Sequence, residues 1–185
     1  MRIAAYDEEY ELVEVNMSFS PVPNYCVPDI FAVTPRFLAQ KGIRLLLLDL
    51  DNTLSPYSED MPPERVLAWM QAMRDAGVTL YIISNNRSQK RIEDYARCCD
   101  IPCMWRAGKP KPAPLFRAME ELGYTQAETA LMGDQIFTDA LAANRAGVTS
   151  IVVKPIKMQN ILFHLRYGVE QPFRKFGKKI LEELT

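Results

Sequence analysis

The feature that most constrains the fold of this chain is an alternation of short apolar runs with helical segments between residues 43 and 153. The runs are rich in Leu, Ile and Val and mostly lack polar alternation, so we expect strands that are buried on both faces. They are Ile43–Leu50, Val78–Ser84, Ile101–Trp105, Thr129–Gly133 and Thr149–Val153. The intervening segments have apolar residues at helical spacing, and most end at a glycine: Pro63–Asp75, Arg87–Cys98, Ala113–Leu122 and Ile136–Ala146.

This alternation predicts an α/β protein, with a parallel sheet between two helical layers and right-handed crossovers. We therefore expect a three-layer, doubly wound, Rossmann-like fold, with residues 20–155 as its core. Residues 156–185 read as an amphipathic helical segment packed on that core, and residues 1–19 as an N-terminal extension. The extension could hold an edge strand at Tyr10–Val15, be a flexible tail, or lie upstream of the true start.

Composition excludes several classes of protein. With 22 basic and 23 acidic residues the net charge is −1, which does not indicate a nucleic-acid-binding protein. No apolar run approaches the ~20 residues of a membrane span, and the acidic first 20 residues do not resemble a targeting signal. The cysteines Cys26, Cys98, Cys99 and Cys103 contain no C-x-x-C pair, so we expect a reduced, cytoplasmic protein.

Residues whose side chains can take part in catalysis or bind a ligand follow four of the predicted strands. They are Asp49, Asp51 and Thr53, then Ser84 and Asn85, then Lys109, and finally Asp134 and Asp139. In parallel sheets of this kind ligands bind beyond the carboxyl ends of the strands, so we expect these side chains to meet at one edge. Crowded carboxylates repel one another and call for a divalent cation, and oxygen ligands favour Mg²⁺. A hydroxyl and an ammonium beside them would suit the oxygens of a transferring phosphoryl group.

Each of these motifs has a simpler interpretation when taken alone. Asp51-Asn52-Thr53 could be a helix cap, Ser84-Asn85-Asn86 a turn, and the lysines near residue 110 part of a solvated loop. Four unrelated turns need not supply the residue types that one reaction requires. We therefore interpret the set as a site for phosphoryl transfer.

The run Asp49-Leu50-Asp51-Asn52-Thr53-Leu54 resembles the D-x-D-x-T signature of haloacid-dehalogenase-like (HAD) phosphatases. Ser84, Lys109 and the segment Gly133-Asp134…Asp139 are similar to the second, third and fourth motifs of that superfamily, in the same order. A narrower resemblance over residues 20–155 is to the YqeG-like family, type IIIA, whose relatives include the mitochondrial phosphatidylglycerophosphate phosphatase.

This resemblance implies roles for the acidic residues. Asp49 would be the nucleophile that forms an aspartyl-phosphate, and Asp51 the acid and base that protonates the leaving group and then activates water. Mg²⁺ would be held by the side chains of Asp49 and Asp134 and by the main-chain carbonyl of Asp51. Asp139 would lie nearby, behind the ligands or as an alternate ligand.

The same resemblance implies that Ser84, Asn85 and Lys109 bind the phosphate and that Thr53 supports the nucleophile loop. The sequence offers a second lysine, Lys111, where the pattern needs one. The distance to the helix that follows favours Lys109, and Lys111 stays as the alternative.

The spacing of the motifs leaves no room for a cap domain. The stretches from Asp51 to Pro63 and from Ser84 to Lys109 are filled by predicted elements, so only the turn Ser55–Met61 can lie over the site. In this superfamily an uncapped site implies a bulky substrate, such as a lipid headgroup or a macromolecule, or a partner subunit that closes the site.

The C-terminal segment has two interpretations. One apolar face combines Met158, Ile161, Leu162 and Leu165, and another combines Phe173, Phe176, Ile180, Leu181 and Leu184, with Arg174, Lys175, Lys178 and Lys179 beside it. A basic amphipathic helix can lie on an anionic membrane surface. We favour packing on the chain's own domain or on a twin subunit in a homo-oligomer, and the membrane-peripheral arrangement stays open.

The sequence therefore predicts a Mg²⁺-dependent phosphomonoester hydrolase that acts on a phosphorylated lipid headgroup or small molecule. The resemblance points to phosphatidylglycerophosphate. A soluble phosphomonoester or a phosphoprotein is the next alternative, and a HAD scaffold that binds without turnover is the alternative from another class.

Overall fold

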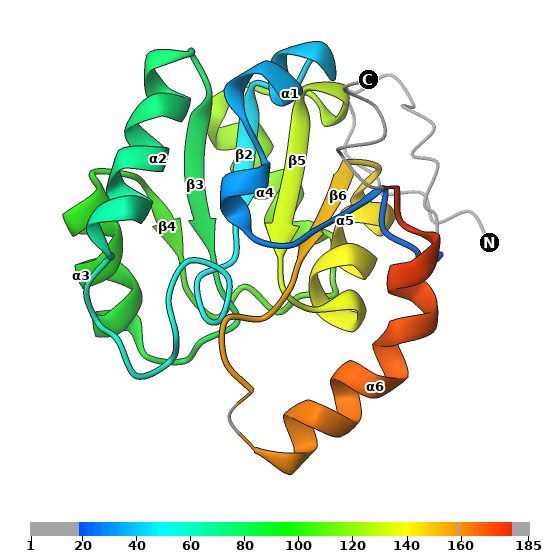
Figure 1. Cartoon of the computed structure of the whole chain (residues 1–185). Helices are drawn as coiled ribbons and strands as arrows, with labels where there is room; N and C mark the ends of the chain where they lie inside the picture. Colours follow the sequence, from blue (N-terminus) through cyan, green and yellow to red (C-terminus); the bar gives the residue numbers. More distant parts are fainter. Residues whose placement is uncertain (1–18, 159, 179–185) are drawn as a thin grey trace, which may run out of the picture.

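Six parallel strands form one sheet in the computed structural model, which describes residues 19–158 and 160–178. The strands are β1 (Tyr25–Val27), β2 (Leu45–Leu48), β3 (Thr79–Ile83), β4 (Cys103–Met104), β5 (Thr129–Gly133) and β6 (Thr149–Val153). Their spatial order is β1-β6-β5-β2-β3-β4, and every neighbouring pair is parallel. This arrangement confirms the predicted α/β sheet (Figure 1).

Helices cover both faces of the sheet. One face carries α1 (Pro35–Gln40), α2 (Glu64–Asp75) and α3 (Gln89–Cys99), and the other carries α4 (Ala113–Leu122) and α5 (Leu141–Ala146). A further helix, α6 (Ile161–Phe176), contacts the π-helical turn η3 (Ile136–Ala140) on the β6 side of the molecule. The three layers are those of a doubly wound fold, and residues 19–158 and 160–178 contain no separate cap domain.

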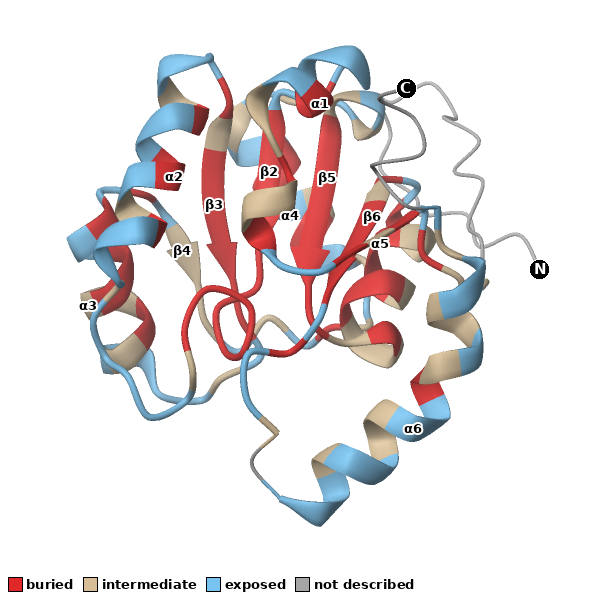
Figure 2. Ribbon diagram, viewed as in Figure 1, coloured by how far each residue is buried: buried red, intermediate tan, exposed pale blue. Residues whose placement is uncertain are grey.

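The central strand β2 shows why the sheet is buried on both faces. Successive side chains of a strand point to opposite faces. Leu46 and Leu48 accordingly pack into the core under α1 to α3, whereas Leu45 and Leu47 pack into the core under α4 and α5. Figure 2 shows the central strands coloured as buried along most of their length.

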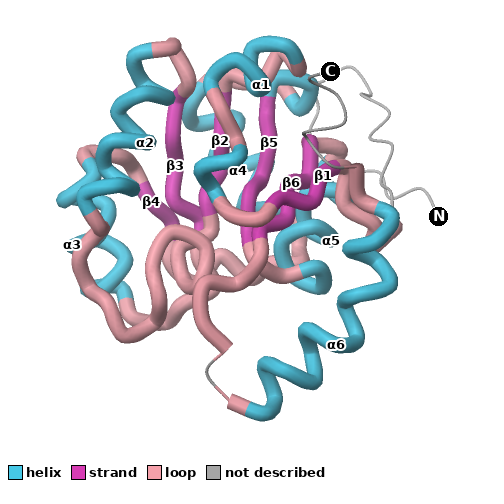
Figure 3. The backbone as a smooth tube through the Cα atoms, viewed as in Figure 1, coloured by secondary structure: helices cyan, strands magenta, loops and turns pink. Residues whose placement is uncertain are grey.

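The order of the strands creates one crevice. From β2 the chain moves outward to β3 and β4, and then returns to β5 on the other side of β2. Such a switch in direction leaves an opening beyond the carboxyl ends of the two strands that flank it, here β2 and β5. Figure 3 shows the loops that follow the strands gathered at this edge.

Several predicted elements differ from the observed ones. The first run forms a strand only over Leu45–Leu48, because the chain turns after Asp49 and Leu54 N donates to Leu50 O. Of Ile101–Trp105, only Cys103–Met104 pairs with the sheet. The predicted helix Ile136–Ala146 begins as the wide turn η3, in which the main-chain N–H groups of both Asp139 and Ala140 donate to Gln135 O.

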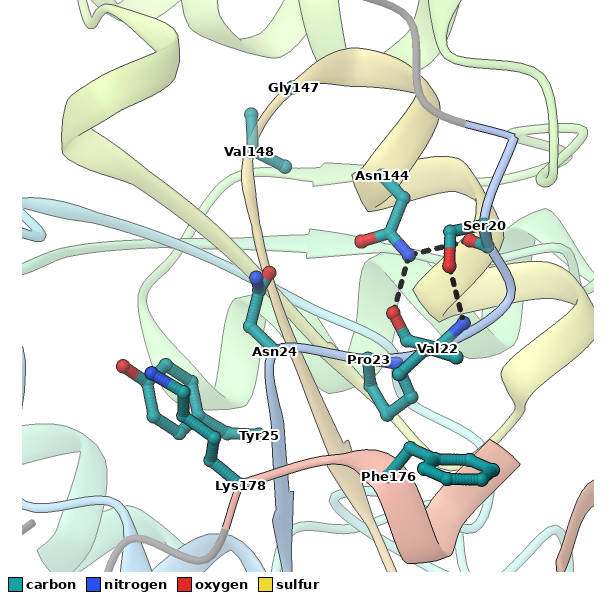
Figure 4. Close-up of a pocket in the computed structure, with 10 residues that line it drawn as sticks. All are labelled: Ser20, Val22, Pro23, Asn24, Tyr25, Asn144, Gly147, Val148, Phe176 and Lys178. Atoms are coloured by element: carbon teal, nitrogen blue, oxygen red, sulfur yellow. Dashed lines mark hydrogen bonds between the residues drawn. The ribbon is translucent and has the colours of Figure 1, made fainter. Parts of the chain in front are cut away.

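The edge strand β1 was absent from the prediction, whose candidate strand Tyr10–Val15 lies outside the described residues. β1 is held to β6 by side chains as well as by the ladder, since Asn24 Oδ1 accepts from the main-chain N of Ser150 at 2.8 Å. A pocket of about 500 Å³ lies beside this contact, at the amino ends of the strands and on the opposite edge from the β2–β5 crevice (Figure 4). In the part of the chain described here, no helix is long and apolar enough to cross a membrane.

Burial on both faces predicts that neighbouring leucines of β2 are equally important for stability. We expect Leu46→Ala and Leu47→Ala each to lower the free energy of unfolding by ~2–5 kcal/mol, because each opens a cavity in a different core. Urea denaturation followed by circular dichroism measures the loss, with the exposed Leu162→Ala as a control within about 0.5 kcal/mol of wild type. A near-neutral result for either strand leucine would contradict a two-sided core.

Candidate active site

Three buried carboxylates meet at the crevice between β2 and β5. Asp49 follows β2 directly, and its main-chain N donates to Met132 O in β5 at 2.9 Å. Asp134 follows β5, and Asp139 comes from η3. One carboxylate oxygen from each of the three aspartates lies within 4.8 Å of the others. Carboxylates this close repel one another unless cations lie between them.

The ammonium of Lys109 is one such cation. Its Nζ lies 2.8 Å from Asp49 Oδ1 and 2.7 Å from Asp139 Oδ1, and it donates to Ile83 O at 2.8 Å. Only 4% of Lys109 is exposed. Lys111, the alternative lysine, lies on the exposed side of the same loop. The structure thus brings Lys109, and not Lys111, against Asp49.

Asn85 fixes the loop that carries this lysine. Its Nδ2 donates to the main-chain O of Lys109 at 2.9 Å, and its Oδ1 accepts from the main-chain N of Lys109 at 2.8 Å. The side chain that the sequence predicted to bind phosphate is therefore engaged in holding the position of the ammonium.

The net effect of burial and neighbouring charges is to raise the pKa values of both Asp49 and Lys109. The pKa of Asp49 is raised to about 7, because burial and the charge of Asp139 raise it more than the ammonium of Lys109 lowers it. Burial alone would lower the pKa of Lys109, but the charges of Asp139 and Asp49 raise it above its ordinary value. The lysine therefore stays protonated, and it favours the ionised form of the carboxyl group that it contacts.

Asp134 is the least satisfied member of the cluster. Among the described residues, no group donates a hydrogen bond to either of its side-chain oxygens, although the side chain is fully buried. Arg166 NH2 in α6 approaches Asp134 Oδ2 at 3.6 Å, beyond hydrogen-bonding distance. Burial, together with the charges of Asp49 and Asp139, raises the pKa of Asp134 well above its ordinary value. Buried carboxylate oxygens that lack donors and face two further carboxylates are suitable ligands for a divalent cation.

A glycine allows the third carboxylate to approach. A Cβ atom on Gly133 would lie 2.3 Å from Asp139 Cγ, so any other residue at this position would displace Asp139. The carboxylate is also held from its own loop, because Asp139 Oδ2 accepts from the main-chain N of Gln135 at 3.0 Å. The π-helical turn thereby directs Asp139 back toward the end of β5.

Asp51 is directed differently from the other acidic residues of the site. Its Oδ1 accepts from Arg91 Nε at 3.2 Å and from Arg91 NH2 at 3.0 Å, and its Oδ2 accepts from Asn86 Nδ2 at 2.6 Å. The side chain does not belong to the group of Asp49, Asp134 and Asp139 that could hold a metal ion. Sequence analysis missed Arg91, because an arginine on the exposed-looking face of an amphipathic helix carries no distinguishing signal.

Thr53 and Ser84 lie against the same centre. Thr53 Oγ1 donates to Asp49 Oδ2 at 3.3 Å. The Ser84 side chain is buried at the end of β3, and its Oγ accepts from the main-chain N of Asn86 at 3.1 Å. Its hydroxyl hydrogen remains available to donate to a bound anion.

The turn Ser55–Met61 and α6 border the opening of the site. The rings of Tyr57 and Phe163 are in edge-to-face contact, with centroids 6.0 Å apart. Burial raises the pKa of the Tyr57 hydroxyl, and the charges of Asp51, Asp49 and Asp134 raise it further, which indicates that this side chain lies close to the cluster.

Polar contacts tie α6 to the β5 loop. Arg174 donates to the main-chain O of Asp134, and Glu170 Oε1 accepts from the main-chain N of Ile136 at 3.1 Å. The sequence analysis had considered this helix for packing or membrane contact and did not place it beside the acidic cluster.

Comparison with known proteins agrees with this geometry. A family profile described as HAD-hydrolase-like matches residues 106–155. The chain is 30% identical over 135 residues to the probable phosphatase YqeG of Bacillus subtilis (strain 168), a match that covers 73% of this chain and 78% of that protein.

More distant relatives share the sequence pattern or the fold. The chain is 24% identical over 143 residues to the chloroplastic phosphatidylglycerophosphate phosphatase 1 of Chlamydomonas reinhardtii, which covers 73% of this chain and 53% of that protein. The solved structure of 3-deoxy-D-manno-octulosonate 8-phosphate phosphatase from Yersinia pestis superposes with a TM-score of 0.51 at 16% identity, over 66% of this chain and 69% of that chain. This last similarity concerns the fold.

The raised pKa values predict a pH-dependent response to metal. In the metal-free protein an acid with a raised pKa holds its proton where the unfolded chain has lost it, so its contribution to stability falls as the pH rises from about 4 to about 7. A divalent cation binds the ionised carboxylates and offsets this loss. We therefore expect Mg²⁺ or Mn²⁺ to raise Tm more at pH 8 than at pH 5.5.

Thermal unfolding with and without metal tests this expectation. Asp134→Asn should remove most of the metal-induced shift in Tm, whereas Asp75→Asn, an exposed substitution in α2, should keep it. An equal shift in Tm for wild type and Asp134→Asn would place the metal elsewhere.

Proposed function

Since this chain belongs to the HAD-like phosphatase family that includes the probable phosphatase YqeG, we propose that it hydrolyses phosphomonoesters through a phosphoryl intermediate on Asp49. The observation that carries the proposal is the buried Asp49 carboxylate, which is 6% exposed and held at 2.8 Å by the Lys109 ammonium beside two further carboxylates. A fixed carboxylate at a switch-point crevice is suited to act as a nucleophile once it is ionised.

In the first step, an Asp49 carboxylate oxygen attacks phosphorus and the bond from phosphorus to the ester oxygen breaks. Asp51 gives a proton to the departing oxygen, which leaves as an alcohol. Both Asp51 oxygens accept hydrogen bonds in this structure, so Asp51 takes up this proton from solvent before the bond breaks. The Ser84 hydroxyl and the Lys109 ammonium lie where they can bind the phosphoryl oxygens. Thr53, by its hydrogen bond to Asp49 Oδ2, orients the attacking group.

In the second step, water attacks the phosphorus of the aspartyl-phosphate. The Asp51 carboxylate, left ionised by the first step, takes a proton from this water. The bond between phosphorus and the Asp49 oxygen breaks, inorganic phosphate is released, and Asp49 returns to its carboxylate form. Asp51 ends the cycle protonated, as it was before the ester bond broke.

The residues that would hold a cation are Asp49, Asp134 and Asp139, or the main-chain O of Asp51 in place of Asp139. All of these ligands are oxygens, which favours Mg²⁺. When bound, such a cation offsets the negative charge of the carboxylates and of the phosphoryl group, so that the two can approach.

For the substrate we propose a phosphomonoester on a lipid headgroup, with phosphatidylglycerophosphate as the first compound to test. One relative is named for that activity, although the chain spans about half of that protein. The helix beside the site supplies a second argument, since the α6 residues Ile161, Leu162, Leu165 and Val169 are 82%, 71%, 66% and 55% exposed. Arg166 in the same helix approaches Asp134, so α6 borders the opening, and its exposed apolar side chains could contact an anionic membrane there.

Replacement of the nucleophile tests the reaction. We expect wild type to release phosphate from 4-nitrophenyl phosphate only with Mg²⁺, and Asp49→Asn to lower kcat by on the order of 10³-fold or more, because the amide is not a nucleophile. Asp75→Asn serves as the control and should match wild type. Full activity of Asp49→Asn would refute the covalent mechanism, and inactivity of wild type toward every phosphomonoester would favour a scaffold that only binds.

Vesicles test the choice of substrate. A triple variant with serine in place of Leu162, Leu165 and Val169 loses the apolar contact area. We expect its turnover of phosphatidylglycerophosphate in anionic vesicles to fall by about tenfold. Turnover of soluble 4-nitrophenyl phosphate should not change. Phe19→Ser, which removes an exposed apolar side chain far from α6 in the sequence, is the control. An equal rate on vesicles for the triple variant would argue for a soluble substrate.

A further inference from the structure

Arg91 in α3 is unusually enclosed for an arginine near the surface, since its side chain is 10% exposed. Its Nε and NH2 atoms lie 3.2 and 3.0 Å from Asp51 Oδ1. The rest of the guanidinium reaches the turn Ser55–Met61, where NH2 donates to Pro56 O at 3.2 Å and NH1 donates to Glu59 O at 2.6 Å. One side chain therefore joins α3, the Asp51 carboxylate and the turn beside the site.

The turn supplies an additional charge to this contact. Asp60 Oδ1 lies 2.6 Å from Arg91 NH1, but its side chain is 83% exposed. An ion pair with so exposed a partner contributes little, because water screens it. The strong partner of the guanidinium is therefore Asp51, whose side chain is 6% exposed.

The second oxygen of Asp51 is held from the same side. Asn86 Nδ2 donates to Asp51 Oδ2 at 2.6 Å, and Asn86 Oδ1 accepts from the main-chain N of Ser88, the N-cap residue of α3. Both carboxylate oxygens are thus fixed by groups at the start of α3. Without these donors, the carboxylate would be free to adopt other rotamers.

The fork of the guanidinium suits this task in a way that a lysine does not. A planar group with five donors can hold a carboxylate on one edge and main-chain carbonyls on the other, whereas an ammonium is a single point of charge. A guanidinium also stays protonated at every pH of interest, so it neither gives nor takes the transferred proton. Any effect of Arg91 on the reaction must therefore act through the groups that it contacts, namely Asp51 and the turn Ser55–Met61.

We propose that Arg91 is a positioning residue that holds the Asp51 carboxyl group and the turn Ser55–Met61 as one unit, so that the proton donor faces the leaving group. The proposal rests on the proposed function, in which Asp51 protonates the departing oxygen. Misplacement of a proton donor by even a short distance removes most of its benefit. The loss should therefore depend on how much the leaving group needs a proton.

Two esters separate this role from a merely structural one. Phenolate is a poor leaving group that needs a proton, whereas 4-nitrophenolate leaves readily without one. The value of kcat/KM reports the step in which the ester bond breaks, if that step is the first irreversible one. We expect Arg91→Gln to lower kcat/KM for phenyl phosphate by about 100-fold, and for 4-nitrophenyl phosphate by less than about tenfold, in the presence of Mg²⁺.

Arg97→Gln, near the end of the same helix, is the matched control. The Arg97 side chain is 74% exposed and pairs with Asp94 of α3, so the variant should leave both values unchanged. Arg91→Lys keeps the positive charge but loses the planar guanidinium. We expect it to lower kcat/KM more for phenyl phosphate than for 4-nitrophenyl phosphate, as Arg91→Gln does, but with smaller losses. If Arg91→Gln does not fold, Arg91→Lys carries the test by itself.

An equal loss of kcat/KM for both esters, or no loss, would overturn the positioning role. Failure of the proposed function would look different, because wild type would then turn over neither ester, or Asp49→Asn would turn over both. In that case the role of Arg91 falls together with the reaction on which it rests.

Discussion

The buried contact between the Lys109 ammonium and the carboxylates of Asp49 and Asp139 is the interaction on which the site depends. It places one positive charge among three carboxylates that are almost entirely removed from water. The carboxylates outnumber the one ammonium. Asp134 is the carboxylate left without a hydrogen-bond donor among the described residues. A buried cluster with excess negative charge is stable only if protons or a further cation offset it. The charge balance therefore favours a bound cation, as the arrangement of the three carboxylates does.

The order of the strands and a few contacts at their carboxyl ends bring this cluster together. β2 and β5 are neighbours at the point where the chain changes direction across the sheet, so the residues after both strands open on the same crevice. Asn85 fixes the lysine loop through two main-chain hydrogen bonds, and Gly133 leaves the space that Asp139 fills. Both contacts are made by residues at the carboxyl ends of the strands, where the crevice lies.

Much of this arrangement could be predicted from the sequence, and the limits are physical. Apolar runs indicate the strands, because burial on both faces leaves a continuous apolar pattern in β2, β3, β5 and β6. Glycines that follow the apolar helical segments indicate where most of the helices end. The edge strand β1 has no such pattern, because a three-residue strand at the edge depends on its neighbour β6. Arg91 was missed for a related reason. Its importance comes from a partner 40 positions away in the sequence, Asp51, and no local pattern reports such a contact.

The shallow cover of the site constrains the substrate. In the described part of the chain, the opening is bordered by one aromatic contact, Tyr57 against Phe163, and by the Arg166 side chain of α6, rather than by a separate domain. Such a border leaves room for a substrate that extends beyond the reacting phosphoryl group. The helix α6, which borders the opening through Phe163 and Arg166, also carries exposed apolar side chains, and these support the lipid headgroup proposed above as the substrate.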